Sequence, residues 1–288
     1  MLIDIVRLLR PHHYTKNLFI FLPAFFSFKL GDTNLLLVLG LTFIAFSLVA
    51  SSIYVLNDYI DKNEDATHPT KSSRPIASGK INGPTAITTG LIIVSIGLLL
   101  GSYISSITLN LLLFYILMNV AYSLRLKHIP IIDLMVISLG FVIRLLSGSI
   151  SVDIFLSKWV IVITFLLSLF LALAKRRDDV LVYERSKIKP RKVLDSYNLK
   201  LVDALILITA STTILAYILW SLSNDAINRL QSEYLYITSF FVILGVFRYL
   251  QITFVFEKSG SPTNILISDS VLQMILLSWI LSFVYILY

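Results

Sequence analysis

The sequence predicts an all-α integral membrane protein with nine transmembrane helices. Of its 288 residues, 57% are hydrophobic and 14% are charged, whereas a soluble domain has about 25% charged residues. A spanning helix needs roughly 20 mostly apolar residues. Nine stretches approach this requirement, namely 15–30, 35–57, 84–104, 107–123, 131–150, 158–175, 202–221, 234–256 and 270–288.

Two of these stretches are unusual. The first is short and is interrupted by Pro23, and the fifth carries Arg144. A charged residue inside a span is costly and is functional by default. The chain has no composition break that would indicate a second domain, so we expect a single domain over residues 1–288. Its long connections are 58–83, 124–130, 176–201 and 257–269.

The distribution of Lys and Arg predicts the orientation. If the N-terminus is cytoplasmic, most of the 24 Lys and Arg residues lie in the N-terminal segment and the long connections. Basic residues concentrate on the cytoplasmic side of membrane proteins. We therefore expect the N-terminus inside, the C-terminus outside and the functional loops in the cytoplasm. The net charge of +7 follows from this asymmetry and does not indicate a nucleic-acid partner.

The segment that follows the second span is rich in acids. Asn57, Asp61 and Asp65 recur at every fourth residue, and Asp58 precedes Asp61 by three. On a helix all four side chains point to one side. Acids near a helix C-terminus oppose the helix dipole, and grouped carboxylates repel each other unless a cation lies between them. A polar loop after a membrane helix is the alternative interpretation.

The chemistry of this segment predicts a diphosphate site at the membrane surface. Oxygen ligands suit Mg²⁺, which usually bridges carboxylates to the phosphates of a substrate. Lys71 and Arg74 follow the acids, and their side chains are suited to phosphate oxygens.

A second polar segment lies between the fourth and fifth spans. It contains Tyr122, Lys127 and Asp133. Lys127 is a compact cation, and Asp133 is a candidate metal ligand. Alternatively, Asp133 is a charge in the first turn of the next helix, where the dipole favours an acid. Arg144 lies three turns later on the same face. It is a candidate functional residue, and the alternative interpretation is that it is a structural partner for Asp133 or Asp58.

Basic residues at two other span ends are candidates for phosphate binding. Lys16 and Asn17 lie at the entrance to the first span, although Lys16 can equally be an interfacial anchor. Lys175 and Arg176 emerge from the sixth span. The basic segment 185–192 that follows either grips phosphates or anchors to anionic lipid.

These features resemble the UbiA superfamily of intramembrane prenyltransferases. The motif NDxxDxxxD at residues 57–65, the nine spans and the second polar loop match over essentially the whole chain. The resemblance implies nine helices in a ring around a central cavity with a cytoplasmic cap. It also implies Mg²⁺ held by two Asp-rich motifs. The second motif departs from the family's usual DxxxD because it holds one acid, Asp133.

Two further segments resemble a narrower branch, the decaprenyl-phosphate phosphoribosyltransferases. These are RPHHYTKN at residues 10–17 and HPTKSSRPIASG at residues 68–79. The branch implies transfer of 5-phosphoribosyl from phosphoribosyl diphosphate to a polyprenyl phosphate, with release of pyrophosphate. It also implies a location in the cell (inner) membrane with the site facing the cytoplasm, and a product that is a precursor of arabinose donors for cell-wall arabinans. Three phosphate-bearing groups require more cations than one diphosphate does, and this chain is rich in them.

The motifs and the resemblance together imply residue roles. The expected metal ligands are Asn57, Asp58, Asp61, Asp65 and Asp133. The expected substrate-binding residues are Lys16, Asn17, Asn57, Lys71, Arg74, Tyr122, Lys175 and Arg176. The expected catalytic residues are Asp58, Asp61, Lys127 and Arg144. Two other functions stay open: an aromatic prenyltransferase that uses a polyprenyl diphosphate, and a transporter whose charged residues line a path.

Overall fold

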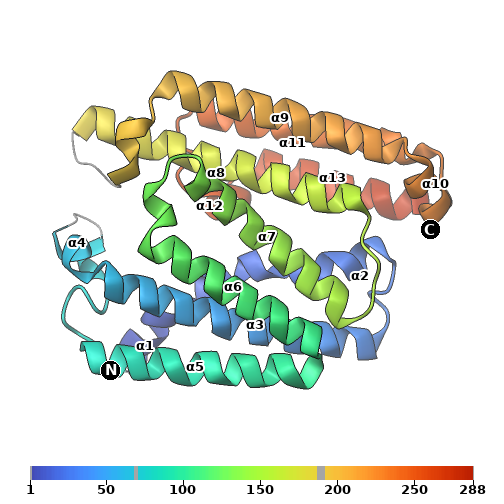
Figure 1. Ribbon diagram of the computed structural model, residues 1–288. Coiled ribbons are helices and arrows are strands. Elements are labelled where there is room, and N and C mark those ends of the chain that lie inside the picture. The colour runs from blue at the N-terminus through green and yellow to red at the C-terminus, as the bar shows by residue number, and fades with distance from the viewer. Residues whose placement is uncertain (1, 68–70, 187–191, 288) are drawn as a thin grey trace. The chain divides into compact units, whose positions relative to one another are not determined.

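The computed structural model describes residues 2–67, 71–186 and 192–287. In these ranges the regular secondary structure is helical and contains no β-strand (Figure 1). The chain divides into two compact units, Met1–Leu156 and Ser157–Tyr288. The prediction of an all-α protein is therefore confirmed.

The first unit is built around one long helix, α3. Its elements in chain order are α1 (Leu2–Leu9), η1 (Pro11–Phe21), α2 (Leu22–Phe26), α3 (Thr33–Ile60), α4 (Lys62–Ala66), η2 (Lys71–Ser73), α5 (Gly83–Ile104), α6 (Ser106–Leu124), η3 (Leu126–His128) and α7 (Ile132–Ser151), where η marks a 3₁₀-helix. Asp32 begins α3 as an N-cap, because its side chain accepts a hydrogen bond from the Leu35 backbone N–H at 3.1 Å.

The core of the first unit lies where α3 meets α5, α6 and α7. Leu39 and Phe46 of α3 are fully buried there with Leu112 of α6. By contrast, Leu99 of α5 and Leu117 of α6 are largely exposed. Leucines exposed on apolar helices suit contact with lipid tails rather than with water.

The 3₁₀-helix η1 runs antiparallel to α3. The contacts of Arg10, Tyr14, Asn17 and Phe21 step down α3 through, in turn, Asp58, Ser51, Ser47 and Phe43. The eleven residues of η1 thus extend alongside a larger number of α3 residues. This is possible because a 3₁₀-helix rises about 2.0 Å per residue, whereas an α-helix rises about 1.5 Å.

The second unit is an array of packed helices. Its elements are α8 (Lys158–Ser186), η4 (Lys192–Ser196), α9 (Leu199–Ser221), α10 (Asn224–Leu230), η5 (Tyr234–Thr238), α11 (Ser239–Phe254), α12 (Pro262–Ser268) and α13 (Ser270–Leu287). Helix α9 packs against α8 and α11, and α11 packs against α13. The Tyr217 hydroxyl links these helices through Thr238 and the Trp279 indole N–H, each at 2.8 Å.

The described residues contain seven helical segments long and apolar enough to span a membrane. These are Thr33–Ile60, Gly83–Ile104, Ser106–Leu124, Ile132–Ser151, Lys158–Ser186, Leu199–Ser221 and Tyr234–Phe254. An eighth is formed if Pro262–Ser268 and Ser270–Ile286, which are bent by 85°, count as one span. The protein is a multi-pass membrane protein. The predicted total of nine spans is not confirmed. Residues 15–30, the first predicted span, form part of η1 and the short α2 instead of one long helix.

Candidate functional site

The acidic segment crosses the end of α3 and enters α4. Asn57 and Asp58 lie in the last turn of α3, Asp61 lies at the junction, and Asp65 lies in α4. The backbone N–H of Asp61 donates to the Asn57 carbonyl at 2.9 Å, and that of Asp65 donates to the Asp61 carbonyl at 2.8 Å. The predicted four-residue spacing therefore persists through the junction, although the helix does not continue as one element.

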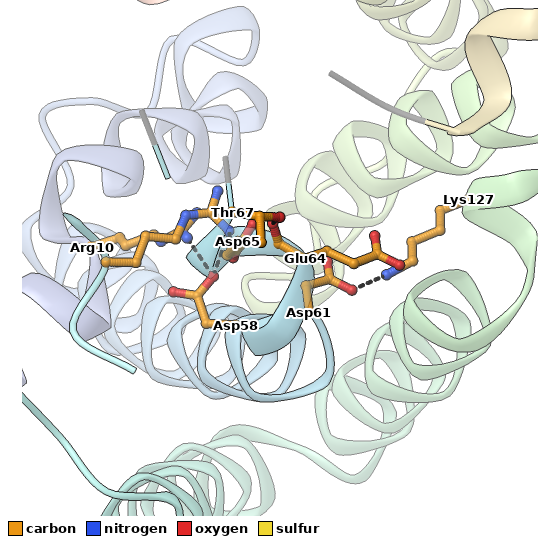
Figure 2. A network of polar contacts seen from close by, with 8 residues as sticks. Arg10, Asp58, Asp61, Glu64, Asp65, Thr67 and Lys127 are labelled. Atoms are coloured by element: carbon orange, nitrogen blue, oxygen red, sulfur yellow. Dashed lines mark hydrogen bonds and ion pairs between the residues drawn. The ribbon is translucent and has the colours of Figure 1, made fainter. Parts of the chain in front are cut away.

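Two arginines converge on Asp58 and Asp65. Asp58 Oδ1 accepts hydrogen bonds from Arg10 at 2.6 Å and from Arg74 at 3.0 Å, and Asp65 Oδ2 accepts from Arg74 at 2.5 Å. Figure 2 shows Arg10, Asp58 and Asp65 gathered on one side of the segment. Asp58 and Asp65 are 2% and 3% exposed. Such burial of a carboxylate requires charge-assisted hydrogen bonds, which the two arginines provide.

Lys127 of η3 pairs with Asp61. Its Nζ lies 2.5 Å from Asp61 Oδ1, and Figure 2 shows Asp61 and Glu64 facing Lys127. This contact joins the two polar segments that the sequence singled out. The ion pair brings Lys127, an expected catalytic residue, to one of the expected metal ligands. Asp133 is fully buried in the first turn of α7, where the helix dipole favours an acid.

Arg10 is the site residue that the sequence analysis missed. It follows α1 with φ 52° and ψ 58°, a left-handed conformation that non-glycine residues adopt infrequently. Its guanidinium lies 5.4 Å from the centre of the Tyr54 ring. Arg10 begins the segment RPHHYTKN, but nothing in its local pattern indicates a partner 48 residues away.

Arg144 lies in a different, uncharged environment. It donates to Asn17 Oδ1 at 2.7 Å, to the Gly140 carbonyl at 2.7 Å and to the Tyr115 hydroxyl at 3.0 Å. Its guanidinium also lies 4.9 Å from the centre of the Phe46 ring. The alternative of a pairing with Asp133 or Asp58 is thus replaced by neutral acceptors and aromatic rings, which can solvate a guanidinium in a buried place.

The structure does not bring Arg144 to the acidic segment. Its neighbour Phe46 lies about 18 Å along α3 from Asp58, at about 1.5 Å per residue. Asn17, predicted to bind substrate, is 1% exposed, and its amide nitrogen donates to Ser47 Oγ at 2.8 Å. Asn17 therefore links η1 to α3 and α7.

The other predicted residues of the first unit lie on four different elements. Lys16 is in the middle of η1, Lys71 in η2, Tyr122 in the last turn of α6 and Asn57 in the last turn of α3. All four residues are half-buried.

In the second unit, two arginines of α8 make ion pairs within that unit. Lys175 is exposed, whereas Arg176 is 2% exposed and pairs with Asp179 at 3.3 Å. Arg177, which was not among the predicted site residues, donates to Asp203 at 2.8 Å and to the Thr253 carbonyl at 3.0 Å. Of the predicted basic segment 185–192, residues 187–191 lie outside the described ranges.

The sequence matches the family model described as the UbiA prenyltransferase family over residues 17–258. The chain belongs to this family. The match includes the acidic segment, Lys127 and Arg144, and it extends through most of both units. The predicted superfamily resemblance is confirmed.

Within this UbiA family, the chain is similar to proteins named decaprenyl-phosphate phosphoribosyltransferase. It is 29% identical to the one from Mycolicibacterium smegmatis, with 96% of this chain and 90% of that protein covered. It is 28% identical to the one from Corynebacterium glutamicum, with 98% and 86% covered. The similarity therefore extends over nearly the full length of both proteins.

Solved structures of UbiA homologues share the fold. The structure of a UbiA homologue from Archaeoglobus fulgidus bound to GPP and Mg²⁺ has a TM-score of 0.72, covers 98% of this chain and 99% of that chain, and is 16% identical. A UbiA homologue from Aeropyrum pernix has a TM-score of 0.61 at 13% identity, with 95% and 98% covered. At these identities the likeness establishes the fold.

The residues of the acidic segment fit a metal that is shared with a substrate. In the parts of the chain that the structure describes, no group of three His, Asp or Glu side chains is arranged to hold a metal ion alone. Mg²⁺, however, is commonly bound by one or two carboxylates together with substrate phosphates. Asp58 Oδ2 is a buried acceptor with no hydrogen-bond partner among the described residues, so it suits a cation.

Proposed function

We propose that the protein transfers 5-phosphoribosyl from phosphoribosyl diphosphate to a polyprenyl phosphate and releases pyrophosphate. The observation that carries this proposal is the full-length similarity to decaprenyl-phosphate phosphoribosyltransferases. The site supports it through its cations. Arg10, Arg74 and Lys127 surround the acidic segment, and this reaction brings together a diphosphate, a 5-phosphate and the phosphate of the lipid.

The proposed roles follow from the contacts. Asp58, through its unpartnered Oδ2, and Asp61 and Asn57 would hold Mg²⁺, with Asp65 and Asp133 as the other predicted ligands. When bound, this ion supplies charge neutralisation for the diphosphate. Basic side chains at the site would donate to phosphate oxygens.

The chemistry needs few protein groups beyond charge. As pyrophosphate departs, Lys71 and Arg74 would stabilise its growing negative charge. Positive charge develops at ribose C1, as in other glycosyl transfers. The oxygen of the lipid phosphate would attack C1 from the opposite face. This oxygen is already anionic at pH 7, so no general base is required, and Lys127 would orient a phosphate.

We also propose that η1 and α2 together form the first membrane crossing, in which the 3₁₀-helix covers more distance per residue than an α-helix. The 11 residues of η1 extend about 22 Å at about 2.0 Å per residue, and the 5 residues of α2 add about 7 Å. The sum is close to the roughly 30 Å hydrocarbon core. Nine crossings would then place the two termini on opposite sides of an inner membrane, and the Lys and Arg distribution favours a cytoplasmic N-terminus and acidic segment with the C-terminus outside. The two units would act as one UbiA-type domain.

The proposal is tested by incubating the purified protein with phosphoribosyl diphosphate, decaprenyl phosphate and Mg²⁺, followed by mass analysis of the lipid. A mass gain of one phosphoribosyl group, absent when EDTA is added, is expected. If the lipid is unchanged under these conditions while wild-type protein prenylates 4-hydroxybenzoate from a polyprenyl diphosphate, the proposal is wrong and the aromatic prenyltransferase alternative holds.

A further inference from the structure

Three carboxylates of the acidic segment have basic partners. Asp58, Asp61 and Asp65 are paired with the three cations of Arg10, Arg74 and Lys127. Paired carboxylates attract a bare divalent cation less strongly than free ones do, because each already has a positive neighbour. The paired cations likewise attract a bare diphosphate less strongly, because each already has a negative neighbour.

The two carboxylate oxygens of Asp58 have different surroundings. Oδ1 accepts from both Arg10 and Arg74, whereas Oδ2 is buried and has no hydrogen-bond partner among the described residues. A divalent cation on Oδ2 would therefore lie within a few ångströms of two guanidinium groups. Repulsion between like charges at that distance is large in a partly buried site. The same guanidinium groups would attract any anion that the metal brings with it.

The residues before and after Arg10 in the sequence hold its backbone in place. Leu8, two residues earlier, is fully buried against Val55, Ile76 and Ile81, and η1 begins at the next residue. The left-handed backbone of Arg10 turns the chain between these elements. The side chain is 17% exposed, so its charge is only partly screened by solvent.

We propose that Arg10 makes binding of the divalent cation depend on the diphosphate. Its charge lowers the affinity of Asp58 for a bare cation and raises the affinity of the metal-loaded site for a diphosphate. Because such coupling is reciprocal, each ligand would strengthen the other's binding by the same factor. That the anion is a diphosphate rests on the proposed function. The inference assigns to Arg10 a positioning and coupling role separate from metal ligation.

The test measures both ligands on full-length protein in nanodiscs, with Arg10→Ala as the variant. The probes are Mn²⁺ alone, followed by the EPR signal of the free ion, and inorganic pyrophosphate at saturating Mn²⁺, followed by equilibrium dialysis. Removal of one nearby positive charge should tighten binding of Mn²⁺ alone by about tenfold and weaken binding of pyrophosphate by about tenfold. The two effects have opposite signs, which a simple loss of structure cannot produce.

Matched variants separate charge from structure. Arg7→Ala removes a neighbouring arginine that is exposed on α1, and both affinities should stay at wild-type values. Arg10→Lys keeps the charge, so Mn²⁺ alone should bind nearly as weakly as to wild type. Thermal unfolding gives an independent measurement: Mn²⁺ should raise the Tm of Arg10→Ala more than it raises that of wild type.

Two results would overturn the inference. One is weaker or unchanged binding of Mn²⁺ alone to Arg10→Ala, and the other is unchanged binding of pyrophosphate. Neither probe contains ribose or lipid, so these results are independent of the transfer assay. A protein that shows the coupling but makes no phosphoribosyl lipid would retain this inference and lose the proposed function.

Discussion

At the scale of single residues, Asp58 and Asp61 differ in what surrounds them. Asp58 is almost fully buried and holds two arginines, whereas the side chain of Asp61 is 22% exposed and holds one lysine. We predict that Asp61→Asn lowers kcat by about 10²–10³, the usual cost of removing one charge-stabilising group, with little change in Tm. Asp58→Asn should lose similar activity and also lower the Tm, because two arginines lose their charged acceptor.

The control is Asp153→Asn, at an exposed turn where the residue has φ 52° and asparagine is well tolerated. This variant should keep both activity and Tm. Near-normal turnover of both Asp58→Asn and Asp61→Asn would show that the acids have no part in the reaction.

Lys127 provides a second test at this scale. If it binds a phosphate in addition to pairing with Asp61, Lys127→Ala should raise the KM for a phosphate-bearing substrate or lower kcat. The double variant Lys127→Ala with Asp61→Ala should be no more active than the single one. Steady-state kinetics measure this. Restored activity in the double variant would instead indicate a purely structural ion pair.

The sequence was sufficient to identify the acids but not their partners. The four-residue spacing of Asn57, Asp61 and Asp65 persists in the backbone hydrogen bonds. The expectation that the acids share one side is wrong, because Asp65 contacts Arg74 whereas Asp61 contacts Lys127. The contact of Arg10 with Asp58 depends on how η1 and α3 pack, which local spacing does not encode. For the same reason the sequence left open a pairing of Arg144 with Asp133 or Asp58, whereas its hydrogen-bond partners include Asn17 and Tyr115.

At the scale of elements, the approach of η1 to α7 depends on Gly148. A Cβ atom at this position would lie 2.0 Å from the Ile20 carbonyl oxygen, and a backbone atom cannot swing away as a side chain can. We predict that Gly148→Ala destabilises the protein by about 1–3 kcal/mol, as expected for overpacking, and lowers the Tm. Gly40→Ala in α3 is the matched control, because its Cβ would meet nothing within 4 Å. An equal Tm for both variants would contradict the close packing of η1.

Hydropathy predicted most spanning helices but missed two kinds of detail. We expected the sixth span to end near residue 175, yet α8 continues to Ser186. Its 29 residues extend about 43 Å, which exceeds the membrane core, and hydropathy marks only the embedded part. The sharp bend at Asp269 was also missed. There the Asp269 side chain accepts a hydrogen bond from the Leu272 N–H at 2.8 Å and pairs with Arg248 at 2.7 Å. A hydropathy profile does not detect such polar contacts.

At the scale of the whole molecule, the composition, the acidic motif and the chain length were enough to predict a UbiA-type membrane protein. The family match over residues 17–258 confirms it. The choice of donor depends on charges whose positions only the folded chain defines. The cation-rich surroundings of the acidic segment favour a reaction with several phosphate groups over an aromatic prenyl transfer, which has one diphosphate.

The most direct test of that claim is a competition in one vessel. Purified protein in nanodiscs receives Mg²⁺, phosphoribosyl diphosphate and decaprenyl phosphate together with a polyprenyl diphosphate and 4-hydroxybenzoate, and the lipids are separated by mass. The proposed function predicts decaprenyl phosphate enlarged by one phosphoribosyl group, with 4-hydroxybenzoate unchanged. Prenylated 4-hydroxybenzoate without any phosphoribosyl lipid would contradict it.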